Sequence, residues 1–554
     1  MTIMSSSEAL MELLRNEGVD YVFGIPGLTE TFFMDALENH PEIKYILGLH
    51  EVVPSGMAEG YARTSGKVGV VNFHTLTGLS AAMPMLHNAY QAGAPILITA
   101  GQQDNRLIMQ EPHLNGDLVR MASQFTKWST EVTYAADIPR AIQRAFKEAT
   151  HPPTGPVFVS LPMNVLNENI DFELAPNTPP FNQLRPDETA INRAIELLKV
   201  TQNPVVIVES GIARNDALPE VVKFAELIGA KVYQHWMADV NFPVQHPQYL
   251  GDLDTMSPRG REILSSVDVL ILIGAPPFSP VVYLTEPLLN NKTKVIQIDD
   301  NPHEIGKNFP VASGIQGNIK TVLAELNGIL DKSMSKSAHQ EAKIRAENTA
   351  REKEAMEKAF LEKVQQERDN IPTSGSRLMS ELRDILKPDT LIVDDCWSYS
   401  AALRRILKFS DTKSFQRARC GGSIGWGMPG ALGVKLAAPD RPVVSVCGDG
   451  SAAWSIQSLW TAARYNIPVK YIVCANKNYA TVKFTKLLLM GEKGKGRYLG
   501  ADIDEPRLDF CQLAQSMGVN SQRVERPDEL RDILKSMVES DKPELVEVSM
   551  EKTS

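Results

Sequence analysis

The chain has 554 residues, which is too long for one hydrophobic core and predicts about three or four domains. Its 43% hydrophobic and 22% charged residues are typical of globular proteins, and no segment offers the roughly 20 apolar residues of a membrane span. A net charge of -10 argues against nucleic-acid binding, which needs clustered Lys and Arg. The first residues lack the pattern of a secretory signal, so we expect a cytoplasmic protein.

Residues 1–172 alternate short apolar runs with helical patterns. Such alternation predicts a parallel sheet wrapped by helices. The expected strands are residues 21–24, 45–48, 68–73, 95–100 and 157–161. A proline-rich polar stretch at 175–186 then predicts a linker.

Residues 188–330 predict a second α/β unit, which carries no catalytic motif of its own and has expected strands at 204–208, 267–273 and 294–298. Residues 331–372 are dense in charge and predict a solvated helical connector. Residues 373–554 predict a third α/β unit. The expected fold class is therefore α/β, with three doubly wound parallel-sheet domains.

The third unit contains the most informative motif of the chain. Gly448-Asp449-Gly450-Ser451 follows an apolar run at 442–447, and Asn476 follows a second run at 469–474. Because the carboxyl ends of neighbouring parallel strands meet at one edge, Asp449 and Asn476 can converge on one hard cation. Gly448 and Gly450 would let a phosphate approach the backbone, and Ser451 would cap a helix over 452–460. Taken alone, Gly-Asp-Gly also fits an ordinary turn between a strand and a helix.

The cysteines offer no metal or disulfide pattern. All five lie in the last third of the chain, without a Cys-x-x-Cys pair or nearby histidine clusters. We therefore expect buried thiols, at Cys396, Cys420, Cys447, Cys474 and Cys511.

A second motif, Glu51 within residues 49–63, lies where a strand-like run passes into a helical one. Together with the Asp449–Asn476 spacing, it makes nearly the whole chain resemble the thiamine diphosphate-dependent enzymes of the pyruvate decarboxylase, acetolactate synthase and benzoylformate decarboxylase group. The chain looks most similar to benzoylformate decarboxylase, through residues 100–103, 127–129, 274–276 and 459–468.

The resemblance implies that the cofactor is thiamine diphosphate and that Mg²⁺ holds its diphosphate. Glu51 would be the activating carboxylate of the aminopyrimidine, although a carboxylate that merely favours a helix N-terminus is the alternative. Asp449 and Asn476 would bind Mg²⁺ through side chains and Asn478 through its carbonyl. Other implied cofactor contacts are the phosphate donors Ser398 and Ser451, the Gly422 carbonyl and the apolar wedge Ile424.

The substrate side matches the family less well. His74 corresponds to a proton-handling histidine of benzoylformate decarboxylase, and His113 is a candidate for a second proton carrier. The family's second histidine is missing, since its position falls near Val281, and Leu28 stands where that family has a substrate-binding serine. The expected pocket is lined by Ile25, Leu28, Gln110, Thr481, Val482 and Phe484.

The resemblance implies a decarboxylase that converts a small 2-oxoacid to an aldehyde. An acetolactate synthase-like carboligase is the alternative enzyme, which Gln110-Glu111 mildly favours, and a non-catalytic cofactor-binding regulatory protein is the alternative of another class. FAD lacks a convincing sequence fingerprint here. The resemblance also implies a homo-oligomer in which two chains share each active site, with a tetramer expected.

Overall fold

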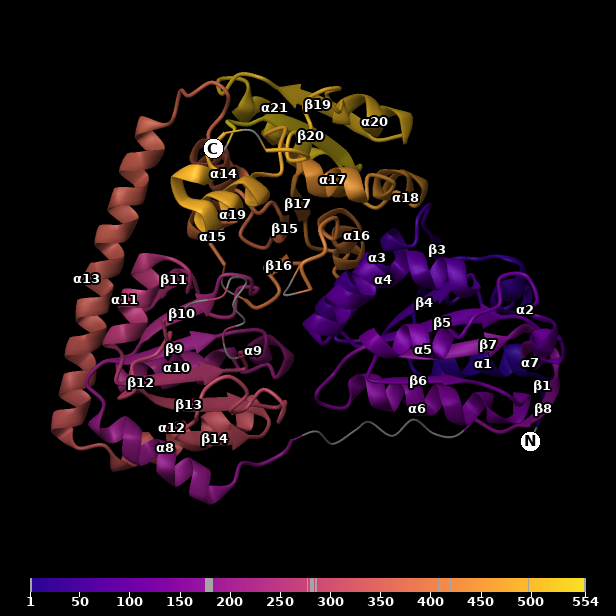
Figure 1. Ribbon diagram of the computed structural model, residues 1–554, viewed down its shortest axis with the longest axis horizontal. Helices are drawn as coiled ribbons and strands as arrows, with labels where there is room; N and C mark the ends of the chain where they lie inside the picture. The colour runs from indigo at the N-terminus through magenta and orange to yellow at the C-terminus, as the bar shows by residue number, and fades with distance from the viewer. Residues whose placement is uncertain are drawn as a thin grey trace.

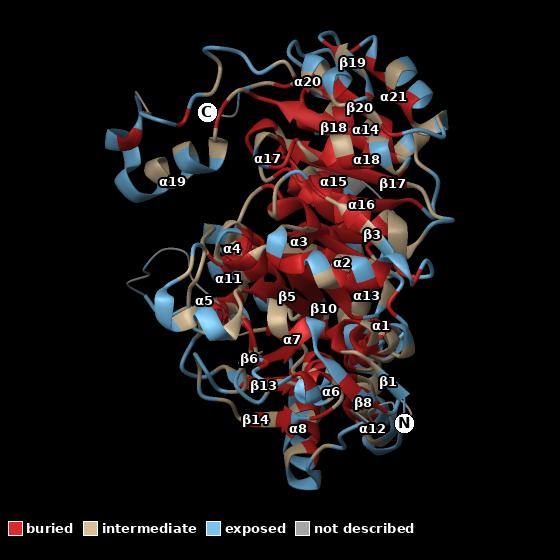
Figure 2. Ribbon diagram, turned by 90° about the vertical axis from the view of Figure 1, so that its right-hand side faces the viewer, coloured by how far each residue is buried: buried red, intermediate tan, exposed pale blue. Residues whose placement is uncertain are grey.

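The computed structural model describes residues 2–174, 183–276, 278, 283, 286–406, 408–409, 411–418, 421–496 and 498–552. These residues form three six-stranded parallel sheets, each covered by helices, which lie in chain order around a common centre (Figure 1). This arrangement is the α/β architecture expected from the alternating pattern. Buried residues run through the sheets from one end of the molecule to the other (Figure 2).

The N-terminal sheet has the strand order β3-β2-β4-β5-β7-β6. Its strands are rich in buried apolar side chains, which is typical of sheets with helices on both faces. A separate antiparallel pair, β1 (Thr2–Ser5) with β8 (Asn169–Phe172), joins the two ends of this unit. The sheet strands are β2 (Tyr21–Ile25), β3 (Lys44–Leu47), β4 (Gly69–Phe73), β5 (Ile96–Gln102), β6 (Trp128–Glu131) and β7 (Val157–Pro162). Its helices are α1 (Ser6–Asn16), α2 (Thr31–Glu38), α3 (Val52–Ser65), α4 (Thr75–Ala92), α5 (Leu118–Ala122), α6 (Ile138–Thr150) and α7 (Met163–Asn167).

The central sheet has the order β11-β10-β9-β12-β13-β14. Strands β10 and β11 are added on one side of β9, and strands β12 to β14 are added on its other side, so the strand order switches between β9 and β12 while the strands stay parallel. Gly211 and Gly274 touch at this point, because a Cβ on Gly211 would lie 2.4 Å from the Gly274 Cα. The strands are β9 (Pro204–Val208), β10 (Lys231–His235), β11 (Tyr249–Leu253), β12 (Val269–Ile273), β13 (Lys294–Asp299) and β14 (Ser313–Gln316). The helices are α8 (Glu188–Val200), α9 (Gly211–Arg214), α10 (Leu218–Ile228), α11 (Pro258–Ser266) and α12 (Ile319–Ser333).

The C-terminal sheet has the order β16-β15-β17-β18-β20-β19. Strands β15, β17 and β18 are neighbours, so the segments that follow them meet at one edge. The strands are β15 (Leu391–Asp395), β16 (Phe415–Arg417), β17 (Val443–Gly448), β18 (Val469–Ala475), β19 (Asn520–Val524) and β20 (Glu544–Ser549). The helices are α14 (Gly375–Ile385), α15 (Ser400–Ile406), α16 (Gly427–Ala437), α17 (Asp449–Trp454), α18 (Ser458–Arg464), α19 (Ala480–Met490), α20 (Phe510–Ser516) and α21 (Leu530–Glu539).

The charged connector forms one long helix, α13 (Lys336–Gln366), along the side of the molecule (Figure 1). It is less solvated than its composition predicts, because Ala342, Thr349 and Lys353 are buried on one face. The Lys353 ammonium donates to the carbonyls of Val244 and His246, and burial lowers its pKa. The helix is therefore packed against the central unit.

Among the described residues, we find no helix that combines the length and the hydropathy of a membrane span.

Helices α3 and α16 join the N-terminal and C-terminal units through closely packed glycines. A Cβ on Gly60 would lie 2.2 Å from the Gly430 carbonyl oxygen, and one on Gly433 would lie 2.0 Å from the Met57 carbonyl oxygen. Only residues without a side chain allow two helix backbones to approach this closely. This contact fixes the two units relative to each other.

Candidate functional site

Three polar residues converge at the carboxyl edge of β17 and β18. Asp449, Asn476 and Asn478 are each only 4% exposed. The Asp449 carboxylate accepts hydrogen bonds from the Gly450 N–H at 2.8 Å and from the Lys477 N–H, and the Asn476 side-chain oxygen accepts one from the Asn478 N–H at 3.2 Å. Lys477 has a φ of 61°, which makes the turn tight. The structure thus places Asp449 and Asn476 at the same edge of the sheet.

The Asp449 carboxylate is held at an energetic cost. Burial raises the pKa of Asp449 to about 6, although the Lys477 and Gly450 N–H groups act in the opposite direction. The Asn478 side-chain oxygen is also buried, and it has no hydrogen-bond partner among the described residues. A bound divalent cation would offset the cost of burying such oxygen atoms.

The backbone around Asp449 differs locally from the expected cap. Helix α17 begins at Asp449, two residues before the expected cap Ser451, and Gly448 takes the N-cap position without a side-chain bond. The helix expected over 452–460 is also interrupted after Trp454 and resumes as α18 at Ser458. The expectation that Ser451 caps this helix is therefore wrong. A Cβ on Gly448 would meet no atom closer than 3.9 Å, so the turn has open space beside it.

The loop at 421–427 lies beside this turn and holds two further expected cofactor contacts. Gly422 has a φ of 74°, and a Cβ on it would meet no atom within 4 Å. Ile424 is half-buried. Ser398, which follows β15, accepts a long hydrogen bond of 3.4 Å from the Asn476 amide. The structure thus brings the C-terminal candidates to one sheet edge.

Glu51 occupies the N-cap position of α3 and is half-buried. Its side chain makes no capping hydrogen bond, which removes the simplest structural role for a carboxylate at this place. The preceding strand β3 contacts α18, because the Tyr465 hydroxyl accepts a 3.0 Å hydrogen bond from the Leu47 N–H. In Figure 2, β3 and α18 lie on the opposite side of the C-terminal unit from α19.

His74 follows β4 and is held by a glutamate that the sequence analysis missed. The Glu30 carboxylate, which is 1% exposed, lies 2.9 Å from the His74 Nδ1 and accepts from the N–H groups of Gly27 and Gly101. The Thr29 hydroxyl is a further donor to it at 2.8 Å. A His74 ring whose Nδ1–H donates to Glu30 would leave Nε2 for other partners. Only the fold brings Glu30 and His74 together, since they are 44 positions apart.

The remaining N-terminal candidates are loosely held. Ile25 ends β2 and is half-buried, whereas Leu28 is 68% exposed. Gln110 and His113 are both exposed, and for His113 the recorded hydrogen bond is to its backbone carbonyl, from the Gln103 side chain. The geometry therefore gives His113 no support as a proton carrier within one chain. The position near Val281 lies outside the described residues.

Helix α19 carries the C-terminal pocket candidates on an exposed surface. Thr481 is exposed, and Val482 and Phe484 are each 54% exposed. The helix projects from the C-terminal unit in Figure 2. Apolar side chains exposed at this density are typical of a surface that another element covers.

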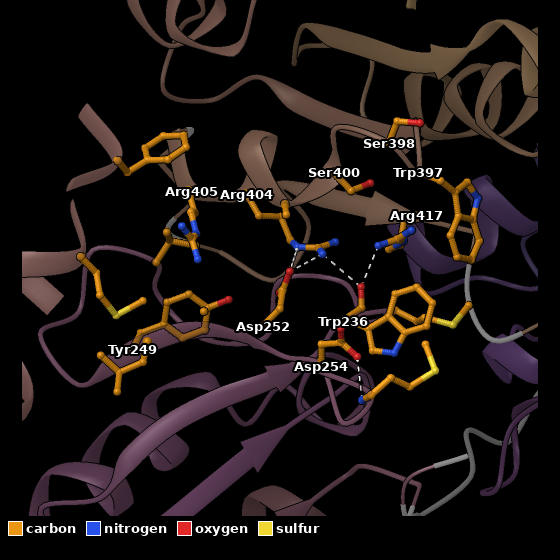
Figure 3. A pocket seen from close by; sticks show the side chains of 18 of the residues that line it. Trp236, Tyr249, Asp252, Asp254, Trp397, Ser398, Ser400, Arg404, Arg405 and Arg417 are labelled. Carbon is orange, nitrogen blue, oxygen red and sulfur yellow. Dashed lines mark hydrogen bonds and ion pairs between the residues drawn. The ribbon is translucent and has the colours of Figure 1, made fainter. Parts of the chain in front are cut away.

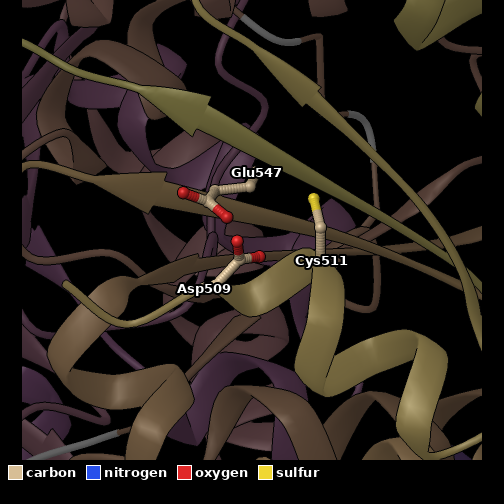
Figure 4. Close-up of side chains that lie close together, drawn as sticks. All are labelled: Asp509, Cys511 and Glu547. Carbon is tan, nitrogen blue, oxygen red and sulfur yellow. The ribbon is translucent and has the colours of Figure 1, made fainter.

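A cluster that could suggest a second metal site is an ion-pair network instead. Asp509, Cys511 and Glu547 lie close together (Figure 4). Arg523, however, lies 2.7 Å from Asp509 and 3.1 Å from Glu547, and Arg507 lies 2.9 Å from Glu547. Two guanidinium groups therefore already neutralise both carboxylates.

Three models of one family match the chain in succession. The thiamine pyrophosphate enzyme N-terminal TPP binding domain matches residues 4–121, the central domain matches 191–326, and the C-terminal TPP binding domain matches 397–548. The chain belongs to the thiamine pyrophosphate enzymes. The Gly448–Ser451 turn lies within the matched C-terminal TPP binding domain.

Relatives in this family cover nearly the whole chain. It is 30% identical over 544 residues to the acetolactate synthase large subunit of Haemophilus influenzae, which covers 96% of this chain and 92% of that protein. It is 29% identical over 550 residues to benzoylformate decarboxylase of Pseudomonas aeruginosa, with 98% of each covered. The solved structure of a thiamine diphosphate-dependent 4-hydroxybenzoylformate decarboxylase from Rhodococcus jostii superposes with a TM-score of 0.86 at 29% identity, covering 100% of both chains.

The residues present fit the cofactor of this family. A carboxylate and amide oxygens are ligands that Mg²⁺ prefers, and the open space beside Gly448 is where a diphosphate can approach the backbone. The residues that would hold the cation and the diphosphate, Asp449, Asn476, Asn478 and the turn at Gly448, lie within one C-terminal unit; we call this group the phosphate cradle.

A cavity of about 1070 Å³ adjoins this cradle, between the C-terminal unit, the central unit and α13. Ser398, Gly422, Thr481 and Phe484 line it on the cofactor side. The opposite wall contains an ion pair of Arg404 with Asp252 and a guanidinium, Arg417, that donates to the Trp236 carbonyl (Figure 3). Trp236 and Trp397 meet edge to face at 5.6 Å. The cavity is large enough for a substrate beside the cofactor.

Proposed function

We propose that the chain is a thiamine diphosphate- and Mg²⁺-dependent decarboxylase that converts a small 2-oxoacid to an aldehyde. The buried convergence of Asp449, Asn476 and Asn478 is the observation that carries this proposal, because these oxygens suit a cation that bridges to a diphosphate. When bound, the cofactor supplies the nucleophilic carbon that makes loss of carbon dioxide possible. Intact Asp449, Asn476 and Glu51 argue against a non-catalytic regulatory protein.

The remaining roles, binding the cation and the cofactor and transferring protons, belong to residues of the chain. Asp449 and Asn476 bind Mg²⁺ through side chains and Asn478 through its carbonyl, while Ser398 and Ser451 donate to the phosphates. Ile424 supports the cofactor from below, and the Gly422 carbonyl, on a residue with open space around it, accepts from the aminopyrimidine. Glu51 shares a proton with the aminopyrimidine, a role consistent with its lack of a capping bond.

His74 is the proposed proton carrier for the substrate. Its Nδ1 is held by Glu30 at 2.9 Å, so the ring is fixed and Nε2 remains able to exchange a proton with a bound substrate. This arrangement of a base with a buried carboxylate behind it is common in general acid–base catalysis. His113 has no comparable support.

The active species is a homo-oligomer in which two chains complete each site. Within one chain, β3, which leads to Glu51, packs on α18, away from the exposed helix α19 that bears the pocket candidates. We call the proposed cation ligands, Asp449, Asn476 and Asn478, the clamp. A second copy would bring its Glu51 to the clamp and would cover Val482 and Phe484. We propose a tetramer built from two such dimers, in the cytoplasm.

The test is release of carbon dioxide from a panel of aliphatic and aromatic 2-oxoacids, with thiamine diphosphate and Mg²⁺ added. We expect one class of acid to give carbon dioxide and the matching aldehyde in equal amounts. If the loaded protein releases carbon dioxide from none of the acids, alone or with an acceptor aldehyde, the proposal is wrong.

Carboligation is the second candidate, because the acetolactate synthase of Haemophilus influenzae is as similar to the chain as the decarboxylases are. The cavity of about 1070 Å³ also leaves room for an acceptor. Incubation with pyruvate, with and without an acceptor aldehyde, separates the two reactions by their products. A flavin-coloured purified protein would favour the synthase.

A further inference from the structure

The loop that bears Gly422 and Ile424 is attached on its N-terminal side to the N-terminal unit of the same chain. The Asn88 amide, on α4, donates to the Ser423 carbonyl at 2.9 Å, and the Asn88 side-chain oxygen accepts from the Ser423 N–H at 3.1 Å. Asn88 is fully buried. A Cβ on Gly421 would lie 2.3 Å from this oxygen, so the neighbouring backbone also fits closely around it. One amide thus satisfies both backbone groups of the residue before Ile424.

On its C-terminal side, the same loop is attached to the end of β15. One oxygen of the Asp395 carboxylate accepts from the Gly425 N–H at 2.9 Å and from the Gly427 N–H at 3.0 Å. Asp395 is 1% exposed. Gly425 has a φ of 91°, and a Cβ on Gly427 would lie 2.5 Å from the Asp395 Cβ, so this side permits no displacement toward the strand. The residue after Ile424 is therefore as firmly held as the residue before it.

We propose that Asn88 and Asp395 are positioning residues that hold Ile424 between them at the position from which it would support the cofactor. This inference rests on the proposed function, since it concerns the wedge of that same site. Asn88 contacts this loop through Ser423, and Asp395 contacts it through Gly425 and Gly427. The Ser451 hydroxyl is a further partner of the Asp395 carboxyl, so of the two residues it is Asp395 that also borders the proposed phosphate donors.

The cost of burying these side chains supports a positioning role. Burial raises the pKa of Asp395 to about 7, because it outweighs the Gly427 and Gly425 donors. A fully buried carboxyl is unfavourable for stability, so its retention here is explained by the loop that it organises. A displaced Ile424 would support the bound cofactor at a different position, and small displacements at a reacting centre are expensive in rate.

The test compares Asn88→Ala, Asn88→Asp, Asp395→Ala and Asp395→Asn with a matched control, Asn327→Ala. Asn327 is a buried asparagine of α12 in the central unit, and its amide also donates to a backbone carbonyl, that of Glu220, at 2.9 Å. Asn88→Asp keeps the size of the side chain but places a carboxylate against the Ser423 carbonyl. Asp395→Asn keeps one oxygen, which suffices because a single oxygen accepts both hydrogen bonds.

The first readout is amide hydrogen exchange of residues 421–427 in the cofactor-free protein. Loss of either attachment, through Asn88 or through Asp395, should raise this exchange about tenfold, because the loop opens more often once a buried hydrogen bond is removed. The second readout is proton exchange at C2 of the bound cofactor, which should slow about tenfold in both alanine variants and in Asn88→Asp. In the Asn88 variants, affinity for thiamine diphosphate with Mg²⁺, measured by calorimetry, should stay within about threefold, because Asn88 holds the loop through Ser423.

Asp395→Asn should behave like the parental chain in all three measurements, a rescue that a purely structural role for the charge would not produce. The positioning role would be overturned by one result. In that result, Asn88→Asp and both alanine variants show the same loop exchange and the same C2 exchange as the Asn327→Ala control. Calorimetry on the parental chain separates the two proposals. Absence of binding there would overturn the proposed function, whereas normal parental binding with unchanged variants would overturn only the positioning role.

Discussion

The two ends of the candidate site differ in how complete they are within one chain. At the diphosphate end, Asp449 and Asn476 are each 4% exposed and are oriented by backbone N–H groups. At the substrate end, Val482 and Phe484 are each 54% exposed on α19. Local turns of one chain position the residues of the first region, whereas the second region leaves apolar side chains exposed to solvent.

This difference agrees with what we propose that each end binds. A small hard cation demands ligand atoms at fixed positions, and tight turns after β17 and β18 supply these from nearby residues. A substrate pocket needs a wide apolar wall, which one helix projecting from a domain does not enclose. The comparison predicts that substitutions at the clamp act on cofactor binding, whereas those on α19 act on assembly.

Asp449→Ala should give the largest effect. Removing the only clamp carboxylate leaves the diphosphate without its bridging cation, so affinity for thiamine diphosphate with Mg²⁺ should fall by at least about 100-fold, given what unpaired charge costs in a cleft. Calorimetric titration measures this. Asp528→Ala, at a surface ion pair with Arg526, is the matched control and should bind normally. Unchanged affinity in Asp449→Ala would remove the clamp assignment.

Glu51→Gln should bind the cofactor with near-parental affinity but lose about 100-fold or more in turnover, because the amide keeps the size of the side chain and removes the shared proton. Exchange of the cofactor C2 proton is the direct measurement.

Mixing Glu51→Gln with Asp449→Ala under conditions of subunit exchange should restore part of the activity, since some hybrid sites receive both intact halves. Exchange verified by mass without recovered activity would contradict the shared site.

The contrast also marks what the sequence predicts well. Residues that follow two apolar runs at a sheet edge, such as Asp449 and Asn476, are predictable because parallel strands align their carboxyl ends. The roles of Glu30 and Asn88 are not predictable in this way. Their partners His74 and Ser423 are 44 and 335 positions away, and no local sequence pattern indicates the pairing. The helix start at Asp449 was missed for a different reason, since glycine at an N-cap leaves no side-chain signal.

Glu30→Ala should lower kcat about tenfold and leave cofactor affinity unchanged. The substitution removes the acceptor that fixes the His74 Nδ1 proton and leaves the Gly27 and Gly101 N–H groups without their partner. Steady-state kinetics on the acid identified by the panel measures kcat, and calorimetry measures binding. Thr31→Ala, which removes an exposed hydroxyl hydrogen bond on the neighbouring helix, is the control. An unchanged kcat in Glu30→Ala would show that His74 needs no such orientation.

Substitutions on α19 should weaken assembly by a smaller amount. Phe484→Ser and Leu489→Ser each remove an exposed apolar side chain, which is worth about 1.5–3 kcal/mol when a second copy covers it. Sedimentation should therefore show a dissociation constant about 10- to 100-fold higher, with the clamp's cofactor affinity nearly intact. Ile344→Ser, at a comparably exposed apolar residue of α13, should change neither. Equal sedimentation of all variants would place the subunit contact elsewhere.

The smallest expected effect concerns the pH dependence of stability at Asp395. Burial raises the pKa of Asp395 in the folded chain to about 7, above the value of about 3.9 for a free carboxyl. The folded state then binds the proton more tightly than the unfolded state, so this group lowers stability progressively as pH rises from about 4 to about 7, and the loss is complete above that range. Asp395→Asn cannot ionise. Its thermal midpoint without cofactor should match the parental value near pH 4 and exceed it by about 2–4 °C at pH 8. A difference between the two midpoints that does not grow with pH would show that this carboxyl is not the source of the dependence.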